Sequence, residues 1–238
     1  MTDRTIVETM IDYYRKRAPI YDDSMGYTDD VIWDKHKAVV DRLGKNLAQR
    51  DVLEIACGPG KWTQTVAEVA HSIVATDVND TTLAEAAKKH YASGRVRFQC
   101  ADAYTLQGID GPFTGAFAVD WWSHIPKARI PEFLQALHNK LTAGARVVFI
   151  DQMCVLRRRW GLYLNSTAPW VLARKGLRRD DEGNIRHIRR LPDGQKFEII
   201  KNFPTREELL SVLEGVARDV EYFEHKPTAR WLLAYTVR

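Results

Sequence analysis

Two glycines stand where a short apolar run gives way to a helical pattern. Gly58 and Gly60 follow residues 51–57, so they mark a sharp strand-to-helix turn at which backbone can approach a ligand closely. Asp77 ends the next apolar run and is placed to accept hydrogen bonds from both hydroxyls of a ribose. The fingerprint of nicotinamide and flavin enzymes also needs a third glycine, but Thr63 occupies that position. The residues therefore indicate a site for a ribose-bearing ligand and count against a nicotinamide oxidoreductase, which stays open as a rival.

The elements that must position these residues are short strands alternating with helices. Strands are expected at residues 51–57, 72–76, 96–100, 113–119, 146–150, 220–223 and 231–237. Helices are expected at residues 4–23, 32–47, 62–70, 80–91 and 130–141, and after Thr205, which forms a capping box with Glu208. This order predicts an α/β fold: a doubly wound, mostly parallel seven-stranded Rossmann-like sheet with an antiparallel last strand.

We expect one domain over residues 1–238, with an N-terminal helical cap at residues 1–48 and an inserted lid at residues 156–195. Regular structure is expected to resume at residues 196–200. Acidic residues or acid-led loops follow the sheet strands, at Asp77, Asp102, Asp120 and Asp151. Ligands bind at the carboxyl ends of the strands in such sheets, so these acids mark the end that carries the site.

Residues 54–62 resemble the first motif of the class I S-adenosylmethionine-dependent methyltransferases, in the form with an acid, then Cys-Gly-Pro-Gly, then Trp. Asp77 is similar to the family's ribose-binding acid, and Val78 to the neighbour that packs on adenine. Asp102 and Ala103 resemble the third motif, whose acid meets the adenine amino group, and Asp120 resembles the fourth. The four motifs come in order, each at an expected strand end.

The resemblance implies S-adenosylmethionine as cofactor and S-adenosylhomocysteine as product. It implies that the cofactor is bound by Ala56, Gly58, Gly60, Asp77, Val78, Asp102, Ala103 and Asp120. The segment at residues 14–22 resembles the cap of the subgroup related to ubiquinone and menaquinone methyltransferases. Tyr13 and Tyr21 in this cap are further candidates for cofactor binding, with ordinary helix packing as the alternative.

The stretch after the fourth expected strand is where the family presents its methyl acceptor. Trp121 and Trp122 are candidates to wall a flat aromatic substrate, or one of them is buried core. His124 is the candidate catalytic base, because the pKa of a histidine lies near ~6.5, and capping a helix or lining the pocket is the alternative. The Asn-Pro-Pro-aromatic signature of nucleobase methylation is absent, which counts against DNA adenine methylation.

Composition sets the remaining expectations. The chain is 45% hydrophobic and 28% charged, as an ordinary globular protein is, and no apolar run approaches the ~20 residues of a membrane helix. The N-terminus lacks the apolar core of a signal peptide. Cys57, Cys100 and Cys154 lie in apolar runs and are interpreted as reduced, buried side chains of a cytoplasmic protein, with no metal site. The oligomeric state is left open.

The positive charge is concentrated in one segment. Residues 155–190 contain ten Lys/Arg and three acids, a net charge of +7, whereas the whole chain carries +4. Three interpretations are open: a solvated surface, an anion-binding lid over a carboxylated or phosphorylated substrate, and RNA binding. The function we expect is methyl transfer to an N or O atom of a small, planar or anionic metabolite. The alternative is an RNA-binding methyltransferase or module that uses residues 157–190.

Overall fold

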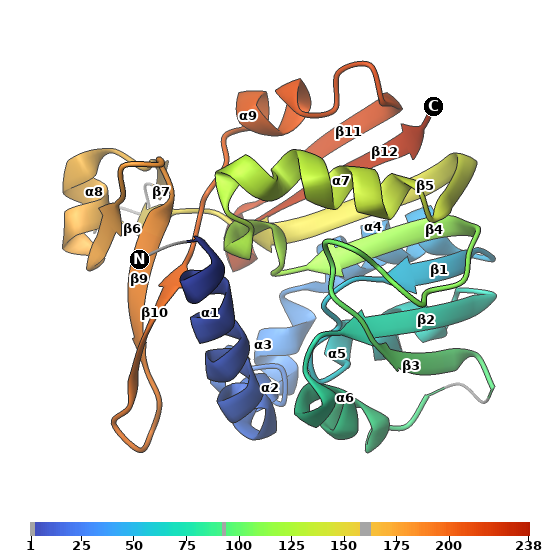
Figure 1. Ribbon diagram of the computed structural model, residues 1–238, viewed down its shortest axis with the longest axis horizontal. Helices are drawn as coiled ribbons and strands as arrows, with labels where there is room; N and C mark the ends of the chain where they lie inside the picture. The colour runs from blue at the N-terminus through green and yellow to red at the C-terminus, as the bar shows by residue number, and fades with distance from the viewer. Residues whose placement is uncertain (1–2, 92–93, 158–162) are drawn as a thin grey trace.

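The computed structural model describes residues 3–91, 94–157 and 163–238. A seven-stranded sheet forms its middle layer (Figure 1). In spatial order its strands are β11 (Ala217–His225), β12 (Arg230–Val237), β5 (Leu141–Gln152), β4 (Phe113–Val119), β1 (Asp51–Glu54), β2 (Ser72–Asp77) and β3 (Val96–Cys100). The strands β1 to β5 are parallel to one another, whereas β12 runs antiparallel to both β5 and β11. The predicted fold class is confirmed.

Helices cover both faces of the sheet, because successive side chains of a strand point to opposite sides. One face carries α4 (Lys37–Leu47), α5 (Lys61–Ala67) and α6 (Asp80–Ala87), and the other carries α7 (Ile130–His138) and α9 (Arg206–Ser211). On β5, Val148 packs on the face that carries α4 and α5, and Phe149 packs on the face that carries α7 and α9.

The helix α4 shows how the sequence produces this packing. Val39, Leu43 and Leu47 are spaced by one helical turn, and all three are fully buried against the sheet. Burying them contributes roughly 5–9 kcal/mol before conformational entropy is counted.

The N-terminal cap is more broken than expected. It comprises α1 (Asp3–Arg17), the 3₁₀ helix η1 (Ala18–Ile20), α2 (Tyr21–Met25) and α3 (Asp30–Asp34). The single helix expected at residues 32–47 was wrong, because a turn at residues 35–36 separates α3 from α4. His36 in this turn is buried and stacks on Trp33, so the chain bends to place both rings against the body of the protein.

The inserted segment forms two small antiparallel sheets and a helix. Its elements are β6 (Val155–Arg157), β7 (Tyr163–Asn165), α8 (Pro169–Arg174), β8 (Leu177–Arg179), β9 (Ile185–Arg190) and β10 (Lys196–Ile200). The lid was expected to end at residue 195, and β10, the next strand, pairs with β9 over its whole length. Of the basic and aromatic residues noted in the sequence, Arg158, Arg159 and Trp160 lie outside the described residues.

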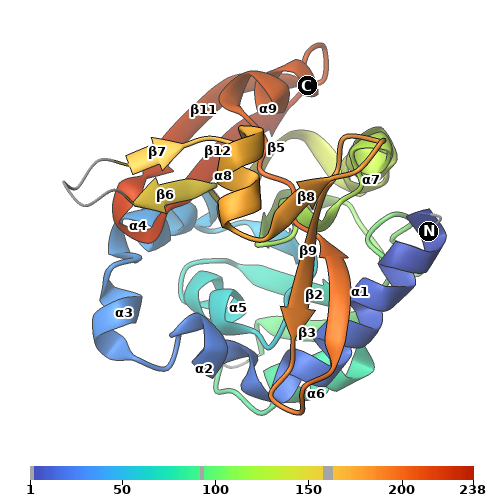
Figure 2. The same cartoon turned by 90° about the vertical axis from the view of Figure 1, so that its left-hand side faces the viewer.

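The cap and the insertion pack on each other, as the views from two sides show (Figures 1 and 2). Ile6, Met10 and Tyr13 of α1 lie in one buried cluster with Phe197 and Ile199 of β10. Two segments almost 190 residues apart in the chain thus close over the same end of the central sheet.

Smaller features complete the chain. The turns after β4 form η2 (Trp122–His124) and η3 (Lys127–Arg129), and η4 (Lys226–Thr228) joins β11 to β12. The capping box at the start of α9 is confirmed: Thr205 accepts a hydrogen bond from the Glu208 amide, and Glu208 accepts one from the Thr205 amide.

The cysteines are all free, but Cys100 is exposed, so the expectation that all three are buried was wrong. Cys100 is the last residue of β3, an edge strand with a neighbour on one side only. Within the described part of the chain, helices are too short or too polar to cross a membrane.

Candidate functional site

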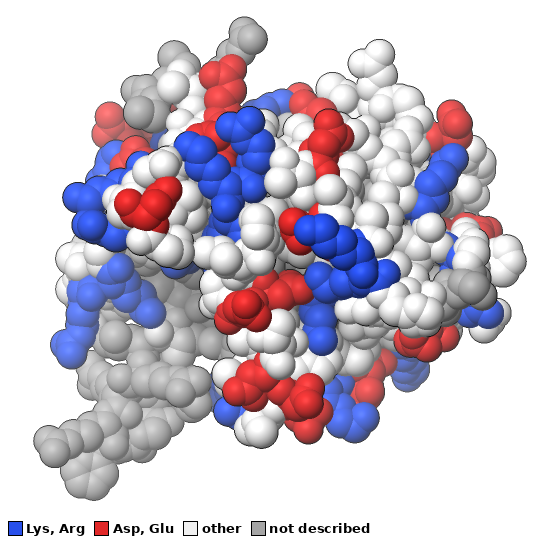
Figure 3. Space-filling model, turned by 90° about the horizontal axis from the view of Figure 1, so that it is seen from below, with Lys and Arg blue, Asp and Glu red and all other residues white. Residues whose placement is uncertain are grey.

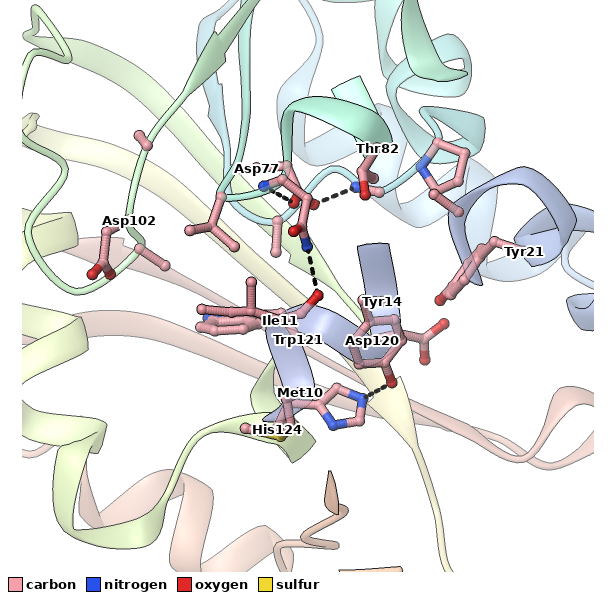
Figure 4. Close-up of a pocket in the computed structure, with 18 of the residues that line it drawn as sticks. Met10, Ile11, Tyr14, Tyr21, Asp77, Thr82, Asp102, Asp120, Trp121 and His124 are labelled. Carbon is pink, nitrogen blue, oxygen red and sulfur yellow. Dashed lines mark hydrogen bonds between the residues drawn. The ribbon is translucent and has the colours of Figure 1, made fainter. Parts of the chain in front are cut away.

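A cavity lies at the carboxyl ends of β1, β2 and β4, under α1 (Figure 4). About 950 Å³ of space not filled by protein atoms lies within it, open solvent at its mouth included. Most of the candidate site residues predicted from the sequence line it. These are Tyr21, Ala56, Gly58, Asp77, Val78, Asp102, Ala103, Asp120, Trp121 and His124. The strand-end acids are therefore brought together, apart from Asp151.

The glycine turn presents backbone to the cavity. Ala56, Gly58 and Gly60 all have left-handed φ values, of 52°, 57° and 84°. A Cβ on Gly58 would meet nothing within 4 Å, consistent with its position in the cavity wall. Gly60 does not line the cavity: a Cβ there would lie 2.2 Å from the hydroxyl oxygen of Tyr91. Its glycine is required by the close approach of α5 to α6.

Asp77 ends β2 and is held by backbone amides. Its carboxylate accepts hydrogen bonds from the amides of Gly58 at 3.2 Å and Asn79 at 2.9 Å. Burial raises the pKa of Asp77 to about 6, although these amides act in the opposite direction. Glu54, at the end of β1, is also buried, and burial raises its pKa well above the ordinary value.

The part of the cavity wall formed by Val78, Asp102 and Ala103 is apolar except for the carboxylate of Asp102. Val78 and Ala103 face the cavity, and Asp102 lies beside them. One oxygen of Asp102 accepts a hydrogen bond from the amide of Tyr104 at 2.8 Å. The Asp102 side chain is exposed, so it retains acceptor capacity for a ligand amino group.

Asp120 ends β4 in a left-handed conformation and is engaged by a buried ion pair. Both of its oxygens accept from the Arg230 guanidinium, at 2.7 and 2.9 Å, and they also accept from Tyr27 and Gln152. Burial alone would raise the pKa of Asp120, but the charge and hydrogen bonds of Arg230 hold it far below the ordinary value. Sequence reasoning missed Arg230 and Tyr27, since they lie 110 and 93 residues from Asp120 in the chain.

His124 is joined to the cap. Its Nδ1 lies 2.6 Å from the carbonyl oxygen of Ile200, and its Nε2 lies 2.8 Å from the hydroxyl of Tyr14. A carbonyl only accepts, so Nδ1 carries the hydrogen and Nε2 accepts from Tyr14. Burial, reinforced by the positive charge of Lys201, lowers the pKa of His124 well below 6.5. The ring is therefore neutral at physiological pH, with both nitrogens occupied.

Besides Gly60, two predicted residues lie away from the cavity. Tyr13 is buried between α1 and β10, where its ring packs on Phe197, and Tyr14 is the tyrosine that reaches the cavity wall. Trp122 is core, with its ring against Phe149 and Trp231, while Trp121 lines the cavity. The alternatives of helix packing for Tyr13 and core for Trp122 are thus the ones observed.

A buried ion pair supports the turn that carries His124. The Lys201 ammonium group lies 2.8 Å from the Ser123 hydroxyl and 3.3 Å from the carboxylate of Asp151. Asp151 also accepts from the Ser123 amide at 2.8 Å. Asp151, near the end of β5, thus holds the backbone at Ser123, immediately before His124, and does not line the cavity.

The cap is fastened to the glycine turn and to the loop after β2. Lys89 pairs with Asp22 of α2 at 2.7 Å and donates to the carbonyl of Pro59. The Asn79 side chain donates to the carbonyl of Ile11 in α1 (Figure 4). A displacement of α1 would therefore shift the loop after β2, which forms part of the cavity wall.

The basic charges of the insertion are partly neutralised within it. Arg186 is buried and paired with Asp180, and Arg178 pairs with Glu198. On the face shown in Figure 3, cations and carboxylates are interspersed over the coloured part of the surface. The RNA-binding alternative gains no support from these observations.

Comparisons with known proteins agree with the geometry. A family model described as a methyltransferase domain matches residues 52–144. The O-methyltransferase cnsE of Penicillium expansum is 30% identical over 139 residues, which cover 53% of this chain and 50% of that protein. The chain thus spans about half the length of the curated relative it matches.

Among solved structures, a complex named DhpI-SAM-HEP is 25% identical, with a TM-score of 0.75 and 99% of both chains covered. A DhpI–SAH complex is 24% identical, with a TM-score of 0.73, and covers 99% of this chain and 98% of that one. The likeness to the ubiquinone and menaquinone subgroup stays a prediction. Residues 52–144 are therefore similar to a methyltransferase domain, and the chain as a whole shares its fold with the DhpI structures solved with SAM and SAH.

Proposed function

We propose that the protein transfers a methyl group from S-adenosylmethionine to an N or O atom of a small, planar or anionic metabolite. The observation that carries this proposal is one cavity that joins the Gly58 turn, Asp77 and the Val78–Ala103 wall, under a cap that limits access of solvent.

The residues present fit the cofactor. Asp77 offers carboxylate oxygens to the two ribose hydroxyls, and the Gly58 turn lets backbone approach the amino-acid part of the ligand. Val78 and Ala103 form an apolar slot for adenine, and Asp102 can accept from its amino group. In this assignment Tyr14 and Tyr21 take the cap role that was expected of Tyr13 and Tyr21.

When bound, S-adenosylmethionine would supply a sulfonium methyl group for direct transfer to a nucleophilic N or O atom, with S-adenosylhomocysteine as the leaving group. The protein then has to hold the acceptor in line and exclude water, and positioning of this kind contributes up to ~7–11 kcal/mol. Tyr14, Trp121 and His124 line the same part of the cavity and are placed to orient a flat acceptor.

For His124 we propose a narrower role than general base. Its neutral ring accepts from the Tyr14 hydroxyl and donates to the backbone of β10, so it fixes the phenol at the cavity wall. Protonating the ring would place a cation in a buried site that already contains Lys201. His124 is therefore better suited to orienting Tyr14 than to collecting the acceptor's proton.

The test is calorimetric titration with S-adenosylhomocysteine. Asp77→Ala should weaken binding by about 10- to 150-fold, because hydrogen bonds to a charged group contribute about 1.5–3 kcal/mol. Glu68→Ala, an exposed acid at the far end of α5, is the matched control and should bind as the wild type does. If the wild type does not bind, or if Asp77→Ala binds equally well, the assignment is wrong.

A further inference from the structure

Three buried side-chain nitrogen atoms on β9 have no hydrogen-bond partner among the described residues. Nη1 of Arg186 lies on one face of the strand, whereas Nδ1 of His187 and Nε of Arg189 lie on the other. His187 and Arg189 are separated by one position on a strand, so their side chains lie on the same face of the inserted sheet. An unpartnered buried nitrogen is costly, and native proteins retain such atoms mainly where something else satisfies them.

This face of β9 is turned toward the roof of the cavity. Arg189 stands opposite Phe197, and His187 stands opposite Ile199. Phe197 and Ile199 are the residues of β10 that pack on α1. The unpartnered nitrogens of His187 and Arg189 therefore lie beside the part of α1 that carries Tyr14.

Arg189 is close enough to act electrostatically on the cavity wall. Its charge bears on both Tyr14 and His124, the pair that joins α1 to η2. Those two residues line the same cavity as Trp121. Arg189 and His187 do not themselves line the cavity, so a group bound to them would lie next to the Tyr14–His124 pair and not beside Val78 and Ala103.

The surroundings of His187 are positive and lack a matching acid. Arg189, Lys201 and Lys175 all disfavour its protonation, as burial does, and together they lower its pKa to about 4. Lys201 is matched by Asp151. Arg189 forms no ion pair within the described part of the chain, although the neighbouring Arg186 is matched by Asp180.

We propose that His187 and Arg189 form a subsite for an oxyanion, a carboxylate or phosphoryl group, carried by the methyl acceptor. This inference rests on the proposed function and narrows it to an anionic substrate. Neutral His187 in the tautomer with hydrogen on Nδ1 donates one hydrogen bond, and the planar guanidinium of Arg189 donates more. The oxyanion would satisfy both nitrogens and anchor the acceptor beside Tyr14.

The experiment is an NMR titration of the full chain with sodium phosphate and, separately, sodium acetate. Ionic strength is held constant with sodium chloride, because screening alone would alter shifts of charged residues. We expect saturable shifts of the His187 and Arg189 resonances with at least one of the two anions. Phosphate alone would indicate a phosphoryl group, and acetate alone a carboxylate.

Variants separate a built site from general attraction to basic charge. Arg189→Gln should weaken the anion by tenfold or more, and Arg189→Lys, which keeps the charge but loses the planar fork, should lie between it and the wild type. Arg190→Gln is the control, since this exposed residue points to the other face of β9, and it should bind within twofold of the wild type. Equal affinity in Arg189→Gln and Arg190→Gln, or non-saturable shifts with both anions, would overturn the proposal.

The same spectra keep this inference separate from the proposed function. Each titration is run with and without S-adenosylhomocysteine, whose binding is followed at the amides of Gly58, Asp77 and Ala103. Arg189→Gln should retain wild-type affinity for S-adenosylhomocysteine, which also shows that the variant is folded. If the wild type does not bind S-adenosylhomocysteine, the methyltransferase assignment is contradicted. If Arg189→Gln and Arg190→Gln bind the anion equally well, the subsite is contradicted.

Discussion

The buried pair between Arg230 and Asp120 offers a sharp test of how the site is held together. Arg230 is 3% exposed and donates to both oxygens of Asp120 and to the hydroxyl of Tyr27. Replacing it by methionine, which has a similar length, removes every one of these donors. Asp120 then becomes a buried carboxylate without its counter-ion.

Breaking a buried pair from one side costs about 3–5 kcal/mol, more than the pair itself contributes. For a chain of this length each kcal/mol lowers Tm by about 2–4 °C, so Arg230→Met should unfold roughly 6–20 °C below the wild type. The pH dependence of the free energy of unfolding follows from the lowered pKa of Asp120. The ionised carboxylate contributes its full stabilisation above the pKa of the unfolded state, near ~3.9, and this contribution disappears as the pH falls through the pKa of the folded state. The difference between wild type and variant should therefore shrink in acid.

Urea unfolding and scanning calorimetry at neutral pH measure the effect. Arg218→Met is the control, because Arg218 and Asp219 are more than half exposed and an exposed pair contributes at most ~1 kcal/mol. Adding Asp120→Asn to Arg230→Met removes the unpaired charge and should recover part of the loss. A cost below about 1 kcal/mol for Arg230→Met would refute the view that this pair neutralises a buried charge.

Three further predictions concern individual side chains. Because ribose hydroxyls need the ionised form of Asp77, whose pKa is about 6, affinity for S-adenosylhomocysteine should fall by up to about tenfold from pH 7 to pH 5. The calorimetric profile of Asp77→Asn should be flat over that range, and a flat wild-type profile would contradict the assignment. Tyr14→Phe leaves Nε2 of His124 without its donor and should cost about 1–3 kcal/mol in urea unfolding. An unchanged midpoint would mean that water replaces the hydroxyl. Thr205→Ala breaks the capping box of α9 and should cost about 1 kcal/mol in the same assay, whereas an effect near zero would show that packing alone fixes the helix start.

The strands were the part of the fold best predicted from sequence. Residues 96–100 and 113–119 became β3 and β4 without change, because turn residues bound each run on both sides. The strand expected at residues 51–57 was too long, since the chain leaves the sheet after Glu54 to form the left-handed turn at Ala56 and Gly58. The expected strand at residues 146–150 was too short, because β5 begins at Leu141 beside β4 and continues to Gln152 beside β12.

The cofactor side of the site was accessible to sequence reasoning because its residues lie at strand ends and follow a local pattern. The helix-packing alternative for Tyr13 had a local signal, since Ile6, Met10 and Tyr13 form one apolar stripe on α1 that packs on β10. The acceptor side was not accessible in the same way. Arg230, Lys201 and Tyr14 reach the site from elements that only the folded chain brings together, and no spacing in the sequence signals such contacts.

The most direct measurement uses S-adenosylmethionine labelled with ¹³C in its transferable methyl group. Bound to the wild-type protein, this methyl should show nuclear Overhauser contacts to ring protons of Tyr14 and Trp121, on the acceptor side of the cavity. Contacts to Val78 or Ala103, where adenine is assigned, should be absent. A methyl group located beside Val78 or Ala103, or the absence of saturable binding, would contradict the proposal that this cavity presents a methyl donor to an acceptor.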